Sequence, residues 1–126
     1  MRKTLTAAAL SAIALSPSLA LAEQPMEHYQ ARLSHADHFT STGARLEGVA
    51  EILRQDRVNY YTFEMRDPED QPDAFFASPA NRMKLETLIA NGNLTAAVRE
   101  EIVYGTPIVE VVVYHNHIDL ELKPER

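Results

Sequence analysis

The sequence predicts a small α+β protein with an amphipathic helix, an antiparallel helical hairpin and a C-terminal β-strand or β-hairpin. Three observations lead to this class. Apolar residues recur at helical spacing over about 43–59, and two sets of helix start and stop signals follow one another over 78–105. A β-branched run then passes into alternating apolar and polar residues over 108–122. The chain has 126 residues, which is enough for one domain and not two.

The first 22 residues have the layout of a secretory signal peptide. A basic pair opens the segment, an apolar stretch covers residues 5–21, and residues 20–22 (Ala-Leu-Ala) put small side chains where a signal peptidase cuts. The apolar stretch is too short for a membrane span, and no later segment is long and apolar enough to be one. We therefore expect an exported protein, periplasmic or secreted, whose working chain begins at Glu23.

The charge and the cysteine content of the chain limit the classes of partner that it can bind. The chain has no cysteine, so an exported form must be stabilised by packing, by a metal or by a partner. Its net charge is −6, and removing Arg2 and Lys3 with the signal leaves ten basic residues against 18 acidic ones, a net charge of −8. Such a charge repels nucleic acid and anionic membranes, whereas a cationic partner, a metal ion included, suits it better.

Residues 23–41 read as a polar, partly flexible lead-in to a single domain at 42–126. Thr42 is a plausible N-cap for the amphipathic helix at about 43–59, whose apolar stripe includes Leu46 and Leu53. The end of this helix stays open, because residues 58–65 are rich in Tyr, Thr and Phe and suit a strand as well.

Residues 66–73 have the composition of a loop, with two prolines and four acidic residues. A solvated loop is a better interpretation than a calcium site, because the alternating ligands and central glycine of an EF-hand are missing.

The helical hairpin follows from local signals. Ser78 is a cap with Pro79 in the first helical position, and Asn91-Gly92 stops the helix. Asn93 caps a second helix that ends at Gly105. Two helices joined by so short a turn are expected to be antiparallel neighbours.

Residues 108–122 allow two interpretations. They form either one strand of about 14 residues or a hairpin that turns at His115-Asn116; typical strand length favours the hairpin and the absence of glycine disfavours it. The strand needs hydrogen-bonding partners, which the hairpin, an extended segment at 58–65 or a second copy of the chain could supply. A homodimer that pairs this C-terminal strand is therefore a hypothesis.

Histidines are the candidate metal ligands. On an extended strand the side chains of His115 and His117 project from one face about 6.8 Å apart, a spacing that suits zinc or copper. His35 and His38 would share one face of a helix and are possible completing ligands. The alternative is a solvated sheet face. The polar residues that alternate with Ile118 along the strand have the pattern of any sheet face that lies in water.

The aromatic residues Tyr60, Tyr61 and Phe63 are the candidate contact residues for a partner or ligand. The neighbouring polar patch at 54–57 reads as a solvated helix face with a local ion pair. Catalysis has little support, because the sequence has no cysteine nucleophile, no Gly-x-Ser-x-Gly elbow and no His-Glu-x-x-His helix.

The sequence thus predicts a small exported, non-enzymatic domain, without a cofactor, that binds an unidentified protein or small ligand. The alternative is a periplasmic transition-metal-binding protein that holds zinc or copper through its His-x-His pair.

Overall fold

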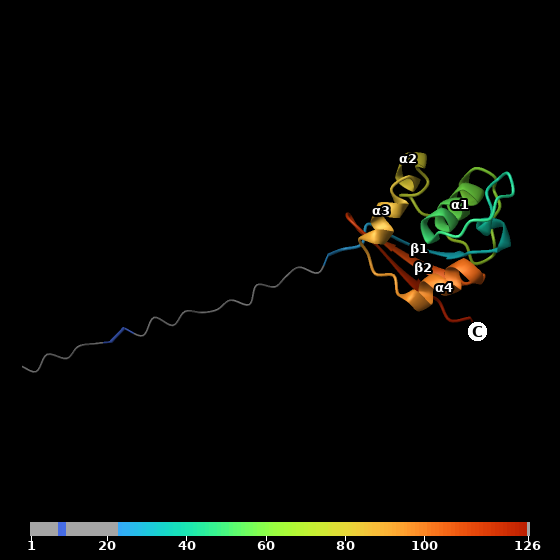
Figure 1. Cartoon of the computed structure of the whole chain (residues 1–126). Helices are drawn as coiled ribbons and strands as arrows, with labels where there is room; N and C mark the ends of the chain where they lie inside the picture. The colour runs from blue at the N-terminus through green and yellow to red at the C-terminus, as the bar shows by residue number, and fades with distance from the viewer. Residues whose placement is uncertain (1–7, 10–22, 126) are drawn as a thin grey trace, which may run out of the picture.

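A computed structural model describes residues 8–9 and 23–125 of the chain, and the predicted signal peptide at 1–22 lies outside them apart from residues 8–9. In this part of the chain, four α-helices, a short 3-10 helix and a three-stranded antiparallel sheet confirm the α+β class (Figure 1). No helix in the described ranges is long and apolar enough to cross a membrane. The elements in chain order are β1 (Glu27–Arg32), η1 (His35–His38), α1 (Val49–Tyr61), α2 (Pro79–Arg82), α3 (Leu85–Ala90), α4 (Ala96–Tyr104), β2 (Ile108–Val113) and β3 (Ile118–Leu122).

The C-terminal region is a β-hairpin, so of the two interpretations of residues 108–122 the hairpin is confirmed and the single long strand is wrong. Val113 pairs with Ile118, and the Tyr114 amide donates to the His117 carbonyl at 2.8 Å. His115 and Asn116 form the turn, and neither has a positive φ. The turn therefore does not use the left-handed conformation that makes glycine favourable in hairpins.

β2 is the central strand, and its second partner is β1. The prediction of a polar lead-in at 23–41 misses this strand, which belongs to the same sheet as the hairpin. Only Tyr29 and Ala31 of β1 are buried and apolar, and they alternate with polar residues that face away from the core. A six-residue strand with so few apolar side chains has the composition of a loop.

The acidic loop covers the outer edge of β1. The Gln30 backbone amide donates to the Gln71 side-chain oxygen at 2.9 Å, and the Gln30 backbone carbonyl accepts from the Gln71 backbone amide. The Arg32 amide donates to the Asp70 carboxylate at 2.9 Å. This loop therefore satisfies backbone groups of an edge strand that would otherwise be open to pairing with another chain.

The helices differ from their predicted boundaries in two places. The first helix begins at Val49, not at 43, because residues 40–44 form a tight turn in which Gly43 has φ 92°. The second predicted helix is divided into α2 and α3 at Met83 and Lys84. The predicted antiparallel pairing of two helices is not confirmed, since α3 and α4 have their main helix contacts with α1.

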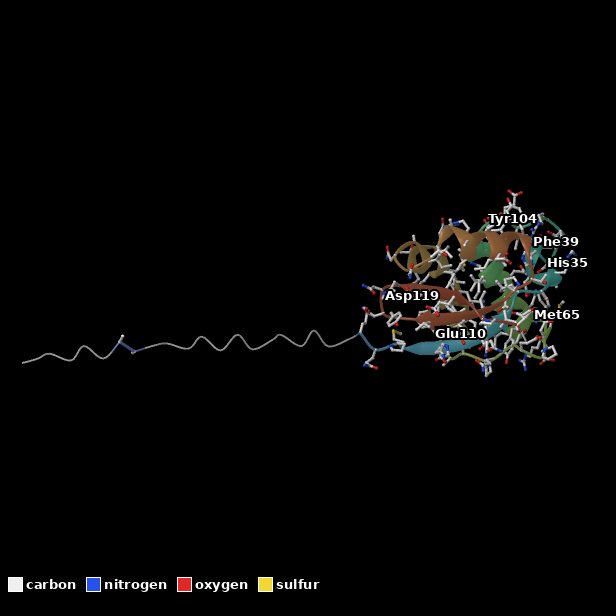
Figure 2. All side chains as sticks on the ribbon, turned by 90° about the horizontal axis from the view of Figure 1, so that it is seen from below. His35, Phe39, Met65, Tyr104, Glu110 and Asp119 are labelled. Carbon is white, nitrogen blue, oxygen red and sulfur yellow. The ribbon has the colours of Figure 1, made fainter. Side chains whose placement is uncertain are left out.

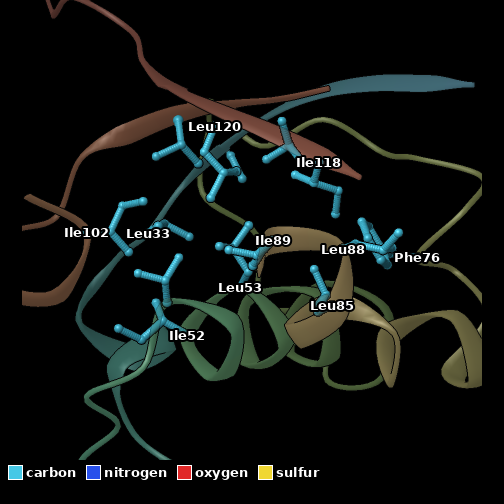
Figure 3. Close-up of a cluster of buried hydrophobic side chains, with 14 of the residues drawn as sticks. Leu33, Ile52, Leu53, Phe76, Leu85, Leu88, Ile89, Ile102, Ile118 and Leu120 are labelled. Carbon is cyan, nitrogen blue, oxygen red and sulfur yellow. The ribbon is translucent and has the colours of Figure 1, made fainter. Parts of the chain in front are cut away.

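One hydrophobic core lies between the sheet and the helices (Figure 3). The register aligns Tyr29, Val111 and Leu120 across the three strands, and all three are buried. The opposite face of the sheet is mostly polar but also carries Ile108 and Val112. A mostly polar face is typical of an antiparallel sheet that is covered on one side. The helices contribute Ile52, Leu53, Leu85, Leu88, Ile89, Ile102 and Val103 to the core.

Candidate functional site

The four candidate histidines lie in two parts of the molecule, His115 and His117 at the β2–β3 turn and His35 and His38 in η1. His115 is exposed in the hairpin turn, and His117 stacks on the Tyr114 ring with centroids 4.3 Å apart. His35 packs against the Phe39 ring, whereas His38 is buried and both of its ring nitrogens face backbone carbonyls. Within residues 8–9 and 23–125, no three His, Asp or Glu side chains come together as a metal site.

The three candidate aromatic residues divide between the interior and the surface. Tyr60 is buried, and Arg57 and Arg66 lie against its ring. The Tyr61 hydroxyl hydrogen-bonds the backbone and carboxylate of Asp73. Phe63 is half exposed and lines a surface cavity.

This cavity lies between the η1 segment and the C-terminal half of α1, and its volume is about 440 Å³. Phe39, Phe63 and Met65 supply apolar surface, and Figure 2 shows Phe39 and Met65 at the same end of the molecule as His35. Polar groups come from α1 and from the residues after η1. The full lining is His35, Ala36, Phe39, Thr40, Ser41, Gln55, Asn59, Phe63 and Met65.

Helix periodicity places the two polar side chains of α1 in this cavity. Gln55 and Asn59 are one turn apart, and the Gln55 amide nitrogen donates to the Asn59 oxygen at 2.9 Å. The Asn59 amide nitrogen in turn donates to the buried Asp37 carboxylate at 2.9 Å. Asn59 is therefore held from both sides and forms a rigid polar part of the wall.

The rim of the cavity contains a strained residue. Glu64 has φ 53°, and it is the one non-glycine residue with positive φ in the described part of the chain. Its conformation reverses the chain after α1 so that the Met65 amide donates to the Asn59 carbonyl at 2.8 Å. Glu64 thereby positions Phe63 and Met65, one on each side of it, along the cavity. Strain of this kind is concentrated at functional sites, because the surrounding structure must stabilise it.

We expect Glu64→Gly to raise the free energy of unfolding by about 0.5–1 kcal/mol, because glycine adopts positive φ without steric cost. Urea denaturation followed by far-UV circular dichroism measures the change. The control is Glu64→Ala, which removes the carboxylate and keeps the Cβ atom, so it should bring no comparable gain. Equal stabilisation by both variants would contradict backbone strain at this residue.

A buried ionic cluster lies behind the cavity. Arg57 is 0 % exposed; its Nε donates to Asp56 at 2.8 Å and its Nη1 to Asp73 at 2.9 Å. The rings of Tyr29 and Tyr60 lie 4.2 Å and 4.6 Å from the guanidinium carbon. Two residues of the patch predicted as a solvated helix face are thus internal, and Asp73 of the predicted solvated loop is buried with them.

Two carboxyl groups of this region are buried near one another. Asp37 and Asp56 are 3 % and 1 % exposed, and Asp37 acts on Asp56 as a like charge. Burial raises the pKa of Asp37, and burial also raises the pKa of Asp56 well above its ordinary value against the opposing charge of Arg57. Because desolvated neighbouring carboxylates repel each other, such a pair holds a proton more tightly than isolated aspartates do.

Comparison with known proteins adds no further constraint, since no family model, curated protein or solved structure matches the chain. Identification of the site therefore rests on its own geometry.

Proposed function

We propose that the protein is a non-enzymatic binding domain that takes a small, largely apolar molecule of about one or two rings into the cavity between η1 and α1. The observation that carries this proposal is the cavity itself. Its volume of about 440 Å³ falls in the range of small-molecule sites. Export to the periplasm or the cell exterior remains part of the proposal and rests on the sequence of residues 1–22.

The lining supports an apolar ligand with a few hydrogen-bonding groups. Phe63 and Met65 are 50 % and 51 % exposed, so a bound ring would remove apolar surface from water at both residues. His35 and Gln55 offer polar atoms at the same cavity, and Asn59 is already oriented by its neighbours. Binding sites commonly combine apolar walls with a small number of fixed polar groups.

A small occupant fits better than an extended partner. The cavity is an open hollow bounded by η1 on one side and by α1 on the other, and its volume of about 440 Å³ suits a compact molecule. The sheet edge that could accept a partner strand at β1 is instead hydrogen-bonded to residues 70 and 71. Insertion of one side chain from another protein is the competing occupant, and a failure of small probes to bind would favour it.

The transition-metal alternative remains a prediction with less support. His117 has the carboxylates of Glu23 and Asp119 at 3.9 Å and 3.8 Å from its ring nitrogens, but His115 is in the turn and does not share this arrangement. Both ring nitrogens of His38 lie against backbone carbonyl oxygens, which occupy the positions that an ion bound to either nitrogen would need.

Titration with anilinonaphthalene sulfonate (ANS), a two-ring dye that fluoresces in apolar sites, tests the binding proposal. We expect one saturable site on the wild-type protein and about fivefold weaker binding to Met65→Gln, because the variant removes roughly 1 kcal/mol of apolar contact. Met83→Gln is the matched control, since Met83 is also exposed, at 70 %, but lies on the α2–α3 connection. Equal affinity of the two variants would contradict the proposed site.

A further inference from the structure

A second hollow adjoins the cavity on the side of the chain segment that follows α1. Its volume is about 290 Å³. Ala36, Asn59 and Met65 line both the cavity and this second hollow. A molecule in the cavity therefore has the second hollow next to it, and the side chains of that hollow determine which chemical group the molecule can carry at this end.

The second hollow contains a strongly basic side chain that is held in a fixed orientation. Among the described residues that line the two hollows, Arg66 is the one arginine or lysine. Its guanidinium carbon lies 4.2 Å from the centroid of the Tyr60 ring, and its Nε donates to the Tyr60 carbonyl at 3.2 Å. Tyr60 is buried, so it is a rigid support for the exposed guanidinium that stacks on it.

The outer edge of this guanidinium is free to bind a ligand. Within residues 8–9 and 23–125, the Nη1 and Nη2 atoms of Arg66 donate no hydrogen bond and no carboxylate forms an ion pair with them. Arg32 and Arg57, in contrast, are each paired with two carboxylates. The edge formed by Nη1 and Nη2 presents two parallel N–H groups, which match the two oxygens of a carboxylate.

Two acidic residues line the same hollow and bear on the sign of the ligand charge. Asp37 is 3 % exposed, and its oxygens accept hydrogen bonds from Ser34 and Asn59, so its carboxylate is engaged by the protein. Asp67 follows Arg66 in the sequence and is partly buried, and it would favour a cation. The net charge of −6 repels anions from most of the surface, so an anionic ligand depends on the local charge of Arg66.

We propose that the cavity takes a small aromatic carboxylic acid, with its rings against Phe63 and Met65 and its carboxylate on the Nη edge of Arg66. This inference rests on the proposed function, since it names the chemical class of ligand for the same cavity. Apolar walls with one fixed charged group at the end are a common arrangement in small-molecule sites. Arg66 is then the residue that selects an acid over a neutral molecule with the same rings.

Competition between naphthalene derivatives of different charge tests this inference. The reporter is N-phenyl-1-naphthylamine, a fluorescent dye that has the rings of ANS without the sulfonate. The competitors carry a carboxylate, a hydroxymethyl or an aminomethyl group at the same ring position. We expect the carboxylate to bind about fivefold more tightly than the neutral alcohol. Arg66→Gln should remove this preference and leave the affinity for the neutral reporter unchanged.

Arg99→Gln is the matched control, because Arg99 is also exposed but lies on α4 beside a different hollow. This variant should keep the preference for the carboxylate. Equal binding of acid and alcohol to the wild type would overturn the inference, as would an equal loss of reporter affinity in Arg66→Gln. Tighter binding of the amine than of the acid would assign the hollow to cations through Asp67.

The neutral reporter distinguishes failure of this inference from failure of the proposed function. Saturable binding of the reporter without a preference for the acid would overturn the inference alone. If neither the reporter nor any competitor binds, the proposed function is refuted and the inference is refuted with it.

Discussion

Arg57→Met should lower the free energy of unfolding by about 3–5 kcal/mol, because it leaves two buried carboxylates without their counter-ion. Asp56 and Asp73 are 1 % and 4 % exposed, and each accepts a hydrogen bond from the Arg57 guanidinium. Methionine keeps an apolar stem in place of the aliphatic part of the arginine and removes the guanidinium, so the charge is the main property that the variant loses. Urea denaturation at neutral pH, followed by far-UV circular dichroism, measures the change.

Arg54→Met is the matched control, because Arg54 lies on the same helix, is only partly buried and donates one long hydrogen bond, to the Arg82 carbonyl at 3.4 Å. Its effect should stay below about 1 kcal/mol. The deficit of Arg57→Met should also shrink in acid, where protonated carboxyls no longer need a cation. A similar small loss for both variants would contradict the account of the ionic cluster.

Gly92→Ala should lower the free energy of unfolding by about 3 kcal/mol, at the upper end of the range for overpacking. A Cβ atom on Gly92 would lie 1.7 Å from the Ile118 carbonyl oxygen, which is backbone and has little freedom to move. This close approach lets the next residue, Asn93, accept from the Leu120 amide at 3.3 Å and donate to the Asp119 carboxylate at 2.9 Å. Alanine would push the α3–α4 connection away from β3.

Gly48→Ala supplies the comparison for this variant. A Cβ atom on Gly48 would meet only the Glu51 side chain, at 3.5 Å, so the expected loss is below about 1 kcal/mol. Thermal unfolding of both variants ranks them directly. Equal melting temperatures would contradict the close backbone contact between Gly92 and β3.

The sequence predicts the fold best where short-range signals agree. The valine-rich run and the alternation after it correspond to β2 and β3, because burial alternates with strand periodicity from Val109 to Val113 and from Ile118 to Leu120. Ser78 does cap a helix that begins at Pro79. β1 could not be predicted from the sequence, because its composition is polar. It is a strand because it pairs with β2, and that pairing joins residues far apart in the sequence.

The candidate site is less predictable for the same reason. Arg57 reads as a solvated residue because its partner Asp73 is 16 residues away and reaches it only after the loop folds back. Asn59 and Met65 belong to no sequence motif. They line the cavity only because η1 packs against the end of α1. The aromatic run that ends at Phe63 does point to the cavity from the sequence. The spacing of Gln55 and Asn59 is a further local signal, but ordinary helices contain many such pairs.

Residue-specific mapping of ANS binding by two-dimensional amide NMR tests the central claim most directly. If the cavity between η1 and α1 is the binding site, saturable shifts should be concentrated in residues 35–41 and 63–65 and at Gln55 and Asn59, the residues that form and adjoin its lining. Amides of α2 and of the β2–β3 turn should remain unshifted. Shifts spread over the polar sheet face or around Met83, or no saturable shift at all, would contradict the claim.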